Sequence, residues 1–189
     1  MPPAPLELRL PDWTDAYLLT NASLPDDKAR MRFVIGLAAE NVRRGTGGPF
    51  GAAVFERASG NPVAIGVNLV PSLAQSMLHA EVVAIMFAQQ RVGSYTLTTS
   101  GTAEHELFTS CEPCAMCLGA VLWSGVRRLV CGATRDDAQS IGFDEGPVDE
   151  DSYEYLQRRG IEVLRRVERE TARDVLRRYA AADGAIYNG

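Results

Sequence analysis

Residues 113–117 read Pro113-Cys114-Ala115-Met116-Cys117, and residues 79–81 upstream of them read His79-Ala80-Glu81. One imidazole and two thiolates can hold Zn²⁺ in a tetrahedral site whose fourth position stays open, which is the arrangement of a catalytic zinc. Glu81, two residues from the histidine, can exchange protons with a water at the open position. The spacing therefore predicts one zinc ion per chain, bound by His79, Cys114 and Cys117.

Both halves of this motif stand where a loop or a strand leads into a helix. Unpaired N–H groups at a helix start favour negative charge, so Cys114 and Cys117 should ionise more readily than a free cysteine. Apolar spacing and turn signals predict helices from Asp26 or Asp27 to about residue 42, from about His79, over 113–123 and over 168–182, with strands over 50–55, 63–69, 104–109, 128–131 and 162–165. Strands that alternate with helices indicate an α/β fold.

Composition limits the class of protein. The chain has 189 residues, of which 46% are hydrophobic and 23% charged, and this favours one globular domain. The proline-rich residues 1–25 are expected to form an irregular N-terminal arm, and residues 26–189 a single domain ending in a helix and a tail. We expect a cytoplasmic protein that does not contact membranes, because the sequence shows neither a spanning apolar run nor a secretory signal. A net charge of −5 makes binding to extended nucleic acid unexpected.

The chain also has two further cysteines, Cys111 and Cys131, and a second histidine, His105. Cys131 lies in an apolar run and is expected to be a buried strand residue. Cys111 is three residues before Cys114, and as a fourth ligand it would close the zinc site; a packed thiol in the loop before the helix is the expectation we favour. His105 has no partner motif beside it, so we do not expect it to bind metal.

The pattern H-x-E…P-C-x-x-C resembles the zinc-dependent cytidine deaminase superfamily. Within that superfamily the chain resembles the guanine deaminase branch, in residues 48–52, 66–68, 79–81, 110–123 and 141–146. The resemblance implies a three-layer α/β/α sandwich with a central mixed sheet, and a homodimer. It also implies a hydrolase that acts on the C–N bond of a cyclic amidine in a small purine base.

For guanine, the implied reaction gives xanthine and ammonia. Water activated by the zinc would attack C2 while Glu81 carries protons. The C2 side of guanine presents two donors, N1–H and the amino group, which the carboxylate of Glu145 can accept. Some guanine deaminases have Asp at the position of Glu145, so the resemblance leaves the preferred aminated ring open.

Four further residues match substrate-contacting positions of the branch. Asn68 would contact the opposite edge of the base, and Phe50 and Trp123 would enclose its ring. Relatives in this branch use a C-terminal tail to cover an active site, their own or that of a neighbouring subunit. The apolar tail 185–189 makes Tyr187 the expected lid residue.

The sequence leaves other substrates and functions open. Guanosine deaminase would act on the same ring with ribose attached, and a triazine or pterin-type amine is a further substrate class. A tRNA adenosine deaminase shares much of the motif but needs a basic surface, whereas the arginines over 158–178 alternate with acidic residues. A deaminase-fold protein that only binds would be expected to lack Glu81 or a ligand, and this chain has all four residues.

Overall fold

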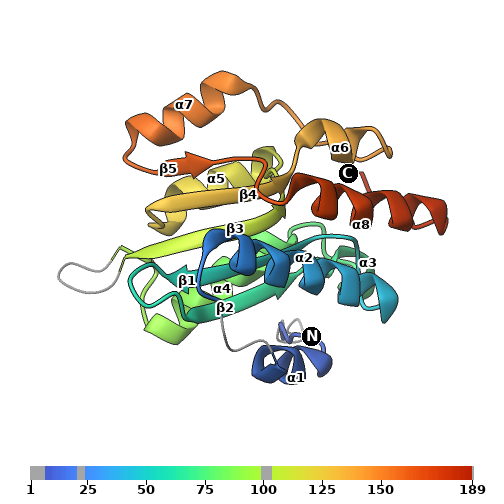
Figure 1. The fold of residues 1–189 in the computed structure, drawn as a ribbon, viewed down its shortest axis with the longest axis horizontal. Helices are drawn as coiled ribbons and strands as arrows, with labels where there is room; N and C mark the ends of the chain where they lie inside the picture. Colours follow the sequence, from blue (N-terminus) through green and yellow to red (C-terminus); the bar gives the residue numbers. More distant parts are fainter. Residues whose placement is uncertain (1–6, 21–23, 99–103, 189) are drawn as a thin grey trace, which may run out of the picture.

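A mixed five-stranded sheet forms the centre of the molecule (Figure 1). The computed structural model describes residues 7–20, 24–98 and 104–188. The strands are β1 (Gly51–Glu56), β2 (Pro62–Val67), β3 (His105–Cys111), β4 (Arg128–Ala133) and β5 (Glu162–Leu164), in the order β2-β1-β3-β4-β5. β1 pairs antiparallel with β2 and β3, whereas β3, β4 and β5 are parallel. The mixed sheet implied by the resemblance is confirmed.

Helices cover both faces of this sheet. α2 (Asp27–Arg43) and α8 (Arg169–Ala181) lie on one face, and α4 (Ala80–Val92) and α5 (Ala115–Ser124) lie on the other (Figure 1). Two apolar clusters fill the spaces between the layers. Alternate residues of β1 divide between them: Ala53 and Phe55 point to the α2 side, and Ala52 and Val54 to the α4 side. The α/β/α sandwich predicted from the resemblance is confirmed.

Local sequence explains where these helices begin and end. The carboxylate of Asp26 accepts the N–H of Ala29 at 2.8 Å and caps α2. Gly93 ends α4 with φ 67° and Gly125 ends α5 with φ 88°, in the left-handed region that favours glycine. The first residues of α4 and α5 both lie at the edge of the sheet where the parallel strands β3 and β4 end. This edge is the usual place for a ligand site in an α/β protein.

The N-terminal arm differs from the expectation, because residues Trp13–Thr20 form a helix, α1. Contacts with the rest of the fold hold it: the Trp13 indole donates to Thr46 Oγ1 at 3.1 Å, and the Tyr17 hydroxyl donates to the Phe33 carbonyl at 2.9 Å. Such contacts depend on residues distant in the sequence, so local periodicity did not reveal them. Residues 1–6 and 21–23 of the arm lie outside the described residues.

Three short helices also lack a counterpart in the sequence prediction: α3 (Val70–Leu73), α6 (Arg135–Gln139) and α7 (Glu150–Arg158). α6 and α7 each begin with a capping box, formed by Thr134 with Asp137 and by Asp149 with Ser152. These capping pairs are a local sequence signal for the start of each helix. Within the described residues, the helices are too short or too polar to cross a bilayer.

Candidate active site

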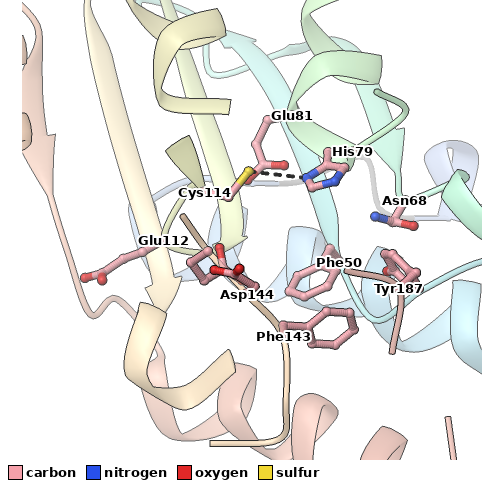
Figure 2. Close-up of a pocket in the computed structure, with 10 residues that line it drawn as sticks. Phe50, Asn68, His79, Glu81, Glu112, Cys114, Phe143, Asp144 and Tyr187 are labelled. Carbon is pink, nitrogen blue, oxygen red and sulfur yellow. Dashed lines mark hydrogen bonds between the residues drawn. The ribbon is translucent and has the colours of Figure 1, made fainter. Parts of the chain in front are cut away.

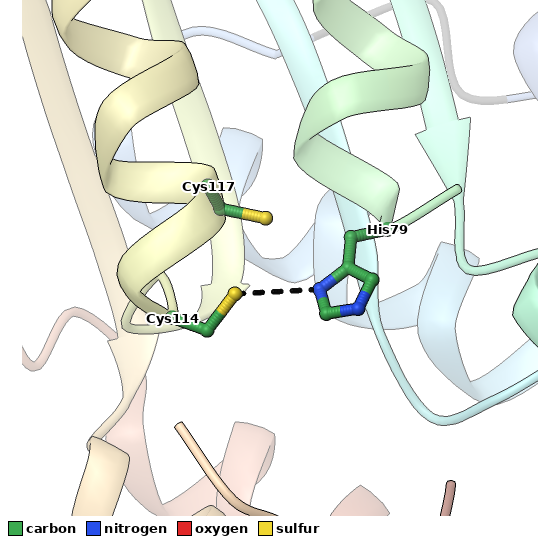
Figure 3. Close-up of side chains that lie close together, drawn as sticks. All are labelled: His79, Cys114 and Cys117. Atoms are coloured by element: carbon green, nitrogen blue, oxygen red, sulfur yellow. Dashed lines mark hydrogen bonds between the residues drawn. The ribbon is translucent and has the colours of Figure 1, made fainter. Parts of the chain in front are cut away.

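His79, Cys114 and Cys117 come together at the starts of α4 and α5 (Figure 3). His79 is the residue that precedes α4, Cys114 precedes α5, and Cys117 lies in the first turn of α5. The imidazole and thiol ligand atoms all lie within 4.8 Å of one another, and Cys114 Sγ is 3.5 Å from His79 Nδ1. The structure therefore brings the three predicted ligands into one cluster.

The cluster suits a zinc ion. Ligand atoms of a tetrahedral zinc are about 3.5–3.8 Å apart, because the metal lies about 2.3 Å from sulfur and about 2.0 Å from nitrogen. A hydrogen bond from Cys117 and then the nearby His79 outweigh burial and lower the pKa of Cys114 to about 4. A thiolate at neutral pH is the form that binds zinc. The expectation of easier ionisation is not met for Cys117, because its hydrogen bond with Cys114 and then burial raise its pKa. Three protein ligands leave one coordination position for water or substrate.

Two other candidate ligands point elsewhere. Cys111 is the last residue of β3, and its buried thiol donates to the Thr134 carbonyl at 3.4 Å. His105, at the start of β3, makes a 2.8 Å contact from Nδ1 to the Leu97 carbonyl oxygen. Neither residue belongs to the cluster, and Cys111 lies at the end of a strand instead of in the expected loop.

Glu81 lies within the first turn of α4, beside the ligand cluster, and is buried. Its Oε1 accepts the Thr109 hydroxyl at 3.0 Å, and its Oε2 accepts the Cys117 thiol at 3.4 Å. Burial and then the negative charge of Cys114 raise the pKa of Glu81 above its usual value. A buried carboxyl with a raised pKa next to a metal site is suited to hold and release a proton.

An enclosed cavity adjoins the cluster (Figure 2). It is lined by Phe50, Asn68, His79, Glu81, Glu112, Cys114, Phe143, Asp144, Glu145 and Tyr187. Glu145 is buried, and burial followed by the charges of Cys114 and Glu81 raises its pKa to about 8. Two of the predicted substrate residues, Glu145 and Asn68, thus share a cavity with two of the predicted zinc ligands, His79 and Cys114.

Asn68 is fixed in this cavity by several bonds. Its Oδ1 accepts the Val70 N–H at 3.2 Å, and its backbone oxygen accepts the side-chain amide of Asn41 at 2.8 Å. Figure 2 shows its amide nitrogen on the side of His79. The amide can therefore offer a donor to a bound molecule.

Aromatic rings form an apolar wall of the cavity. Phe143 meets Phe50 edge to face with ring centroids 5.0 Å apart, and it meets Tyr187 edge to face at 5.1 Å. The tail of the same chain delivers Tyr187, whose buried hydroxyl has no hydrogen-bond partner among the described residues. Aromatic side chains of this kind can pack against the flat ring of a bound base. Phe50 and Tyr187 are thus placed at the cavity as expected.

Trp123 does not line the cavity. It is 75% exposed on the surface of α5. Val121 of the same helix is buried. Two residues along an α-helix correspond to a rotation of about 200° around its axis, so Trp123 points away from the sheet. The sequence expectation that Trp123 encloses a base in the cavity of its own chain is not met, because Trp123 lies on the face of α5 that points away from the sheet.

Three lining or supporting residues were not identified from the sequence. Phe143 and Asp144 lie in the segment 141–146, which was noted only for Glu145. Glu112 directly precedes the Pro113–Cys117 motif, and that position was its available signal. Its buried carboxylate accepts Arg165 Nε at 2.6 Å and the Arg135 N–H at 3.0 Å. Figure 2 shows this carboxylate directed away from His79, so its contacts hold the loop before Cys114.

Comparisons with known proteins agree with this geometry. Residues 25–133 match the family model described as "Cytidine and deoxycytidylate deaminase zinc-binding region". The chain belongs to this zinc-dependent deaminase family. Deaminases of this kind are hydrolases that act on C–N bonds, and the His/Cys/Cys cluster of this deaminase could hold one zinc ion.

Several relatives of this deaminase are known. It is 39% identical over 115 residues to the guanine deaminase of Bacillus subtilis, which covers 61% of this chain and 69% of the relative. It is 33% identical to a tRNA-specific adenosine deaminase of Haemophilus influenzae, with 61% and 63% of the two chains covered. A solved structure concerning guanine deaminase from Nitrosomonas europaea has a TM-score of 0.86 at 42% identity, and covers 94% of this chain and 97% of that one.

The solved structures also include ligand complexes. A variant of the protein NE0047 in complex with 8-azaguanine has a TM-score of 0.87 at 42% identity, with 96% of this chain and 98% of that chain covered. NE0047 in complex with 2,6-diaminopurine has a TM-score of 0.87 at 44% identity, with 96% of both chains covered. Both ligands are purine-like bases with amino groups.

Proposed function

We propose that this deaminase hydrolyses guanine to xanthine and ammonia. The observation that carries the proposal is a buried glutamate, Glu145, in the same enclosed cavity as Glu81 and the ligand cluster. The relatives named as guanine deaminases, and the solved complexes with 8-azaguanine and 2,6-diaminopurine, support this substrate class.

The chemistry of the base matches the polar end of the cavity. Guanine presents N1–H and the 2-amino group side by side, and a carboxylate at Glu145 can accept from both. Adenine and cytosine offer no such adjacent pair of donors at their reacting carbons. Asn68 would donate to an acceptor on the opposite edge of the ring. The buried polar groups would be left unpaired by a base that lacks these partners, which gives selectivity.

Proton transfer would be divided between two carboxyl groups. A zinc ion held by His79, Cys114 and Cys117 would supply a Lewis acid that activates water at neutral pH. Glu81 would take a proton beside the ligand cluster and deliver it to the ring. Glu145, with a pKa of about 8, can hold and release a proton near neutral pH and could pass one to the leaving amino group. Phe50, Phe143 and Tyr187 would keep bulk water from the bound ring.

The test is an ammonia-release screen with zinc-loaded protein. It covers guanine, guanosine, adenine, cytosine, cytidine and a tRNA anticodon loop. We expect turnover of guanine above all others. Preferential release from guanosine or from the RNA would replace this proposal with one of the alternatives, and no release from any of them would leave a binding protein.

Substitutions of Glu81 and Glu145 test the role of each carboxyl group. Glu81→Ala should abolish ammonia release while zinc content stays at one per chain, and normal turnover would refute the mechanism. Glu145→Gln removes the second proton carrier but keeps the shape of the side chain. It should retain zinc and lower guanine turnover by about 10²-fold or more. An unchanged rate would remove Glu145 from the reaction.

A homodimer is the second part of the proposal. α5 is apolar along its length, yet only Cys117, Val121 and Ser124 are buried, and Trp123 is 75% exposed. Helices that are apolar all round are normally covered. Light scattering after size-exclusion chromatography should give twice the mass of the chain, and Trp123→Glu should shift the protein towards the monomer. A wild-type monomer at micromolar concentration would contradict this part.

A further inference from the structure

One side chain, Asn188, joins the C-terminal tail to the loop that carries Glu145. Asn188 Nδ2 donates to the Gly142 carbonyl at 2.9 Å, and Asn188 Oδ1 accepts the Asp144 N–H at 2.8 Å. The Asn188 side-chain amide therefore donates one hydrogen bond and accepts another from the same loop. A peptide group of a neighbouring β-strand pairs in the same way. This pair of bonds fixes the backbone immediately before Glu145.

The other side of Glu145 is fixed separately. The Glu145 carbonyl accepts the Ala115 N–H at 2.9 Å, at the start of α5, and Asp144 Oδ1 accepts the Gly146 N–H at 2.9 Å. Gly142 and Gly146 have φ of 107° and 68°, so the loop turns sharply at both ends. Glu145 thus stands between an anchor on α5 and an anchor on the tail.

The tail itself is part of the cavity wall. Tyr187, the residue before Asn188, packs on the ring of Phe143 and lines the cavity. The Tyr179 hydroxyl of α8 donates to the Ala185 carbonyl at 2.6 Å and holds the start of the tail. Because Tyr187 and Asn188 are adjacent, a movement of the tail backbone that carried the ring out of the cavity would also break the bonds of Asn188.

We propose that Asn188 is a positioning residue, whose side-chain amide holds Glu145 towards the cavity when the tail is closed. Closure of the tail over the substrate and placement of Glu145 would then be one event. This inference rests on the proposed function, because it assigns the positioning to deamination by Glu145. Surface hydrogen bonds contribute modestly, so a moderate effect on rate is expected.

The first experiment compares Asn188→Ala with the wild type in the zinc-loaded protein. We expect kcat for guanine to fall roughly three- to tenfold, with zinc content unchanged. Hydrogen exchange of the Asp144 amide should become faster, because that N–H loses its acceptor. Asn61→Ala, an exposed position in the turn between β1 and β2, is the matched control and should change neither quantity. An unchanged Asp144 exchange rate or an unchanged kcat would overturn the proposal.

A double-mutant cycle separates positioning of Glu145 from simple anchoring of the tail. If Asn188 acts through Glu145, then Asn188→Ala should have little further effect on kcat in a Glu145→Gln background. If Asn188 only anchors the tail, its effect should multiply with that of Glu145→Gln, and that result would overturn the proposal.

Failure of the proposed function gives a different pattern. The wild type would then release no ammonia from guanine, whatever happens at Asn188. A wild type that is active on guanine together with an Asn188→Ala variant of equal kcat would refute only the positioning role.

Discussion

Gly48 lies against the hydroxyl of Tyr187, so closely that a Cβ atom on Gly48 would collide with it. Gly48 is buried and belongs to the segment that leads into β1, and Tyr187 belongs to the C-terminal tail. Two segments that are far apart in the sequence thus meet beside the cavity. The tail can close in the observed position only because residue 48 has no side chain.

Gly48→Ala should therefore displace Tyr187 and open the cavity. We expect the KM for guanine to rise about tenfold, since the ring would lose a packing partner and gain contact with water. Zinc content should stay at one per chain. Steady-state kinetics and metal analysis would measure both. Gly119→Ala on α5 is the control, because a Cβ there meets no atom within 4 Å. Equal KM values for the two variants would show that the tail does not close as observed.

Thr109→Val tests how the proton carrier is held. The Thr109 hydroxyl stabilises the ionised form of Glu81, so its removal should raise the already elevated pKa of Glu81 further. kcat/KM should then fall about tenfold at low pH and less at high pH, with the acidic limb of the pH profile moved upwards. A matched control is Thr171→Val, at an exposed position of α8. A uniform loss across pH would mean that Thr109 serves the fold and not Glu81.

Sequence spacing was sufficient to predict that His79, Cys114 and Cys117 form one cluster with Glu81 beside it. His79 and Glu81 belong to one helix start, and Cys114 and Cys117 to another, so each pair is fixed by local geometry. Whether the two starts meet depends on the pairing of β3, which leads into α5, with β1, against which α4 packs. The α/β pattern suggested a sheet but did not specify this strand order.

Residues whose placement depends on distant contacts were harder to find. Asn68, Glu145 and Tyr187 were identified only through the family resemblance. Phe143 reaches the cavity because the 141–146 loop brings its ring against Phe50 and Tyr187, and periodicity carries no information on such a loop. Trp123 shows the opposite error, since a resemblance placed it at the site while its helix turns it to the surface of its own chain.

Arg165→Met should destabilise the fold and weaken zinc binding together. The side chain of Glu112 is 2% exposed, and Arg165 Nε donates to it at 2.6 Å. Removing the guanidinium leaves a buried carboxylate unpaired, which costs about 3 kcal/mol of unfolding free energy. Because Glu112 is two residues before Cys114, the ligand loop should loosen and zinc affinity should drop.

Chemical denaturation and competition with a zinc chelator would measure the two effects. Arg178→Met is the control, since the Arg178–Asp174 pair on α8 is exposed and 4.0 Å apart. Adding Glu112→Gln to Arg165→Met should restore much of the stability, because the buried group is then neutral. An Arg165→Met variant as stable as Arg178→Met would contradict this account of Glu112.

The Asp137–Arg169 pair predicts how stability depends on pH. Burial alone would raise the pKa of Asp137, but hydrogen bonds from Arg169 and Thr134 outweigh it and lower the pKa from 3.8 to about 2. Above about pH 4 the carboxylate is ionised in both folded and unfolded chains, and the pair contributes its full stabilisation. As pH falls from about 4 to about 2, the unfolded chain binds a proton first, so this stabilisation is lost.

Asp137→Asn should remove that dependence. We expect the variant to unfold about 1–2 kcal/mol more easily than the wild type near neutral pH, and the difference to shrink steadily below pH 4. Denaturation curves from pH 2.5 to 7 would measure it, and loss of zinc in acid cancels because it is common to both proteins. Asp136→Asn, an exposed neighbour on the same helix, is the control. Parallel curves for wild type and Asp137→Asn would show that Asp137 titrates as it does in the unfolded chain.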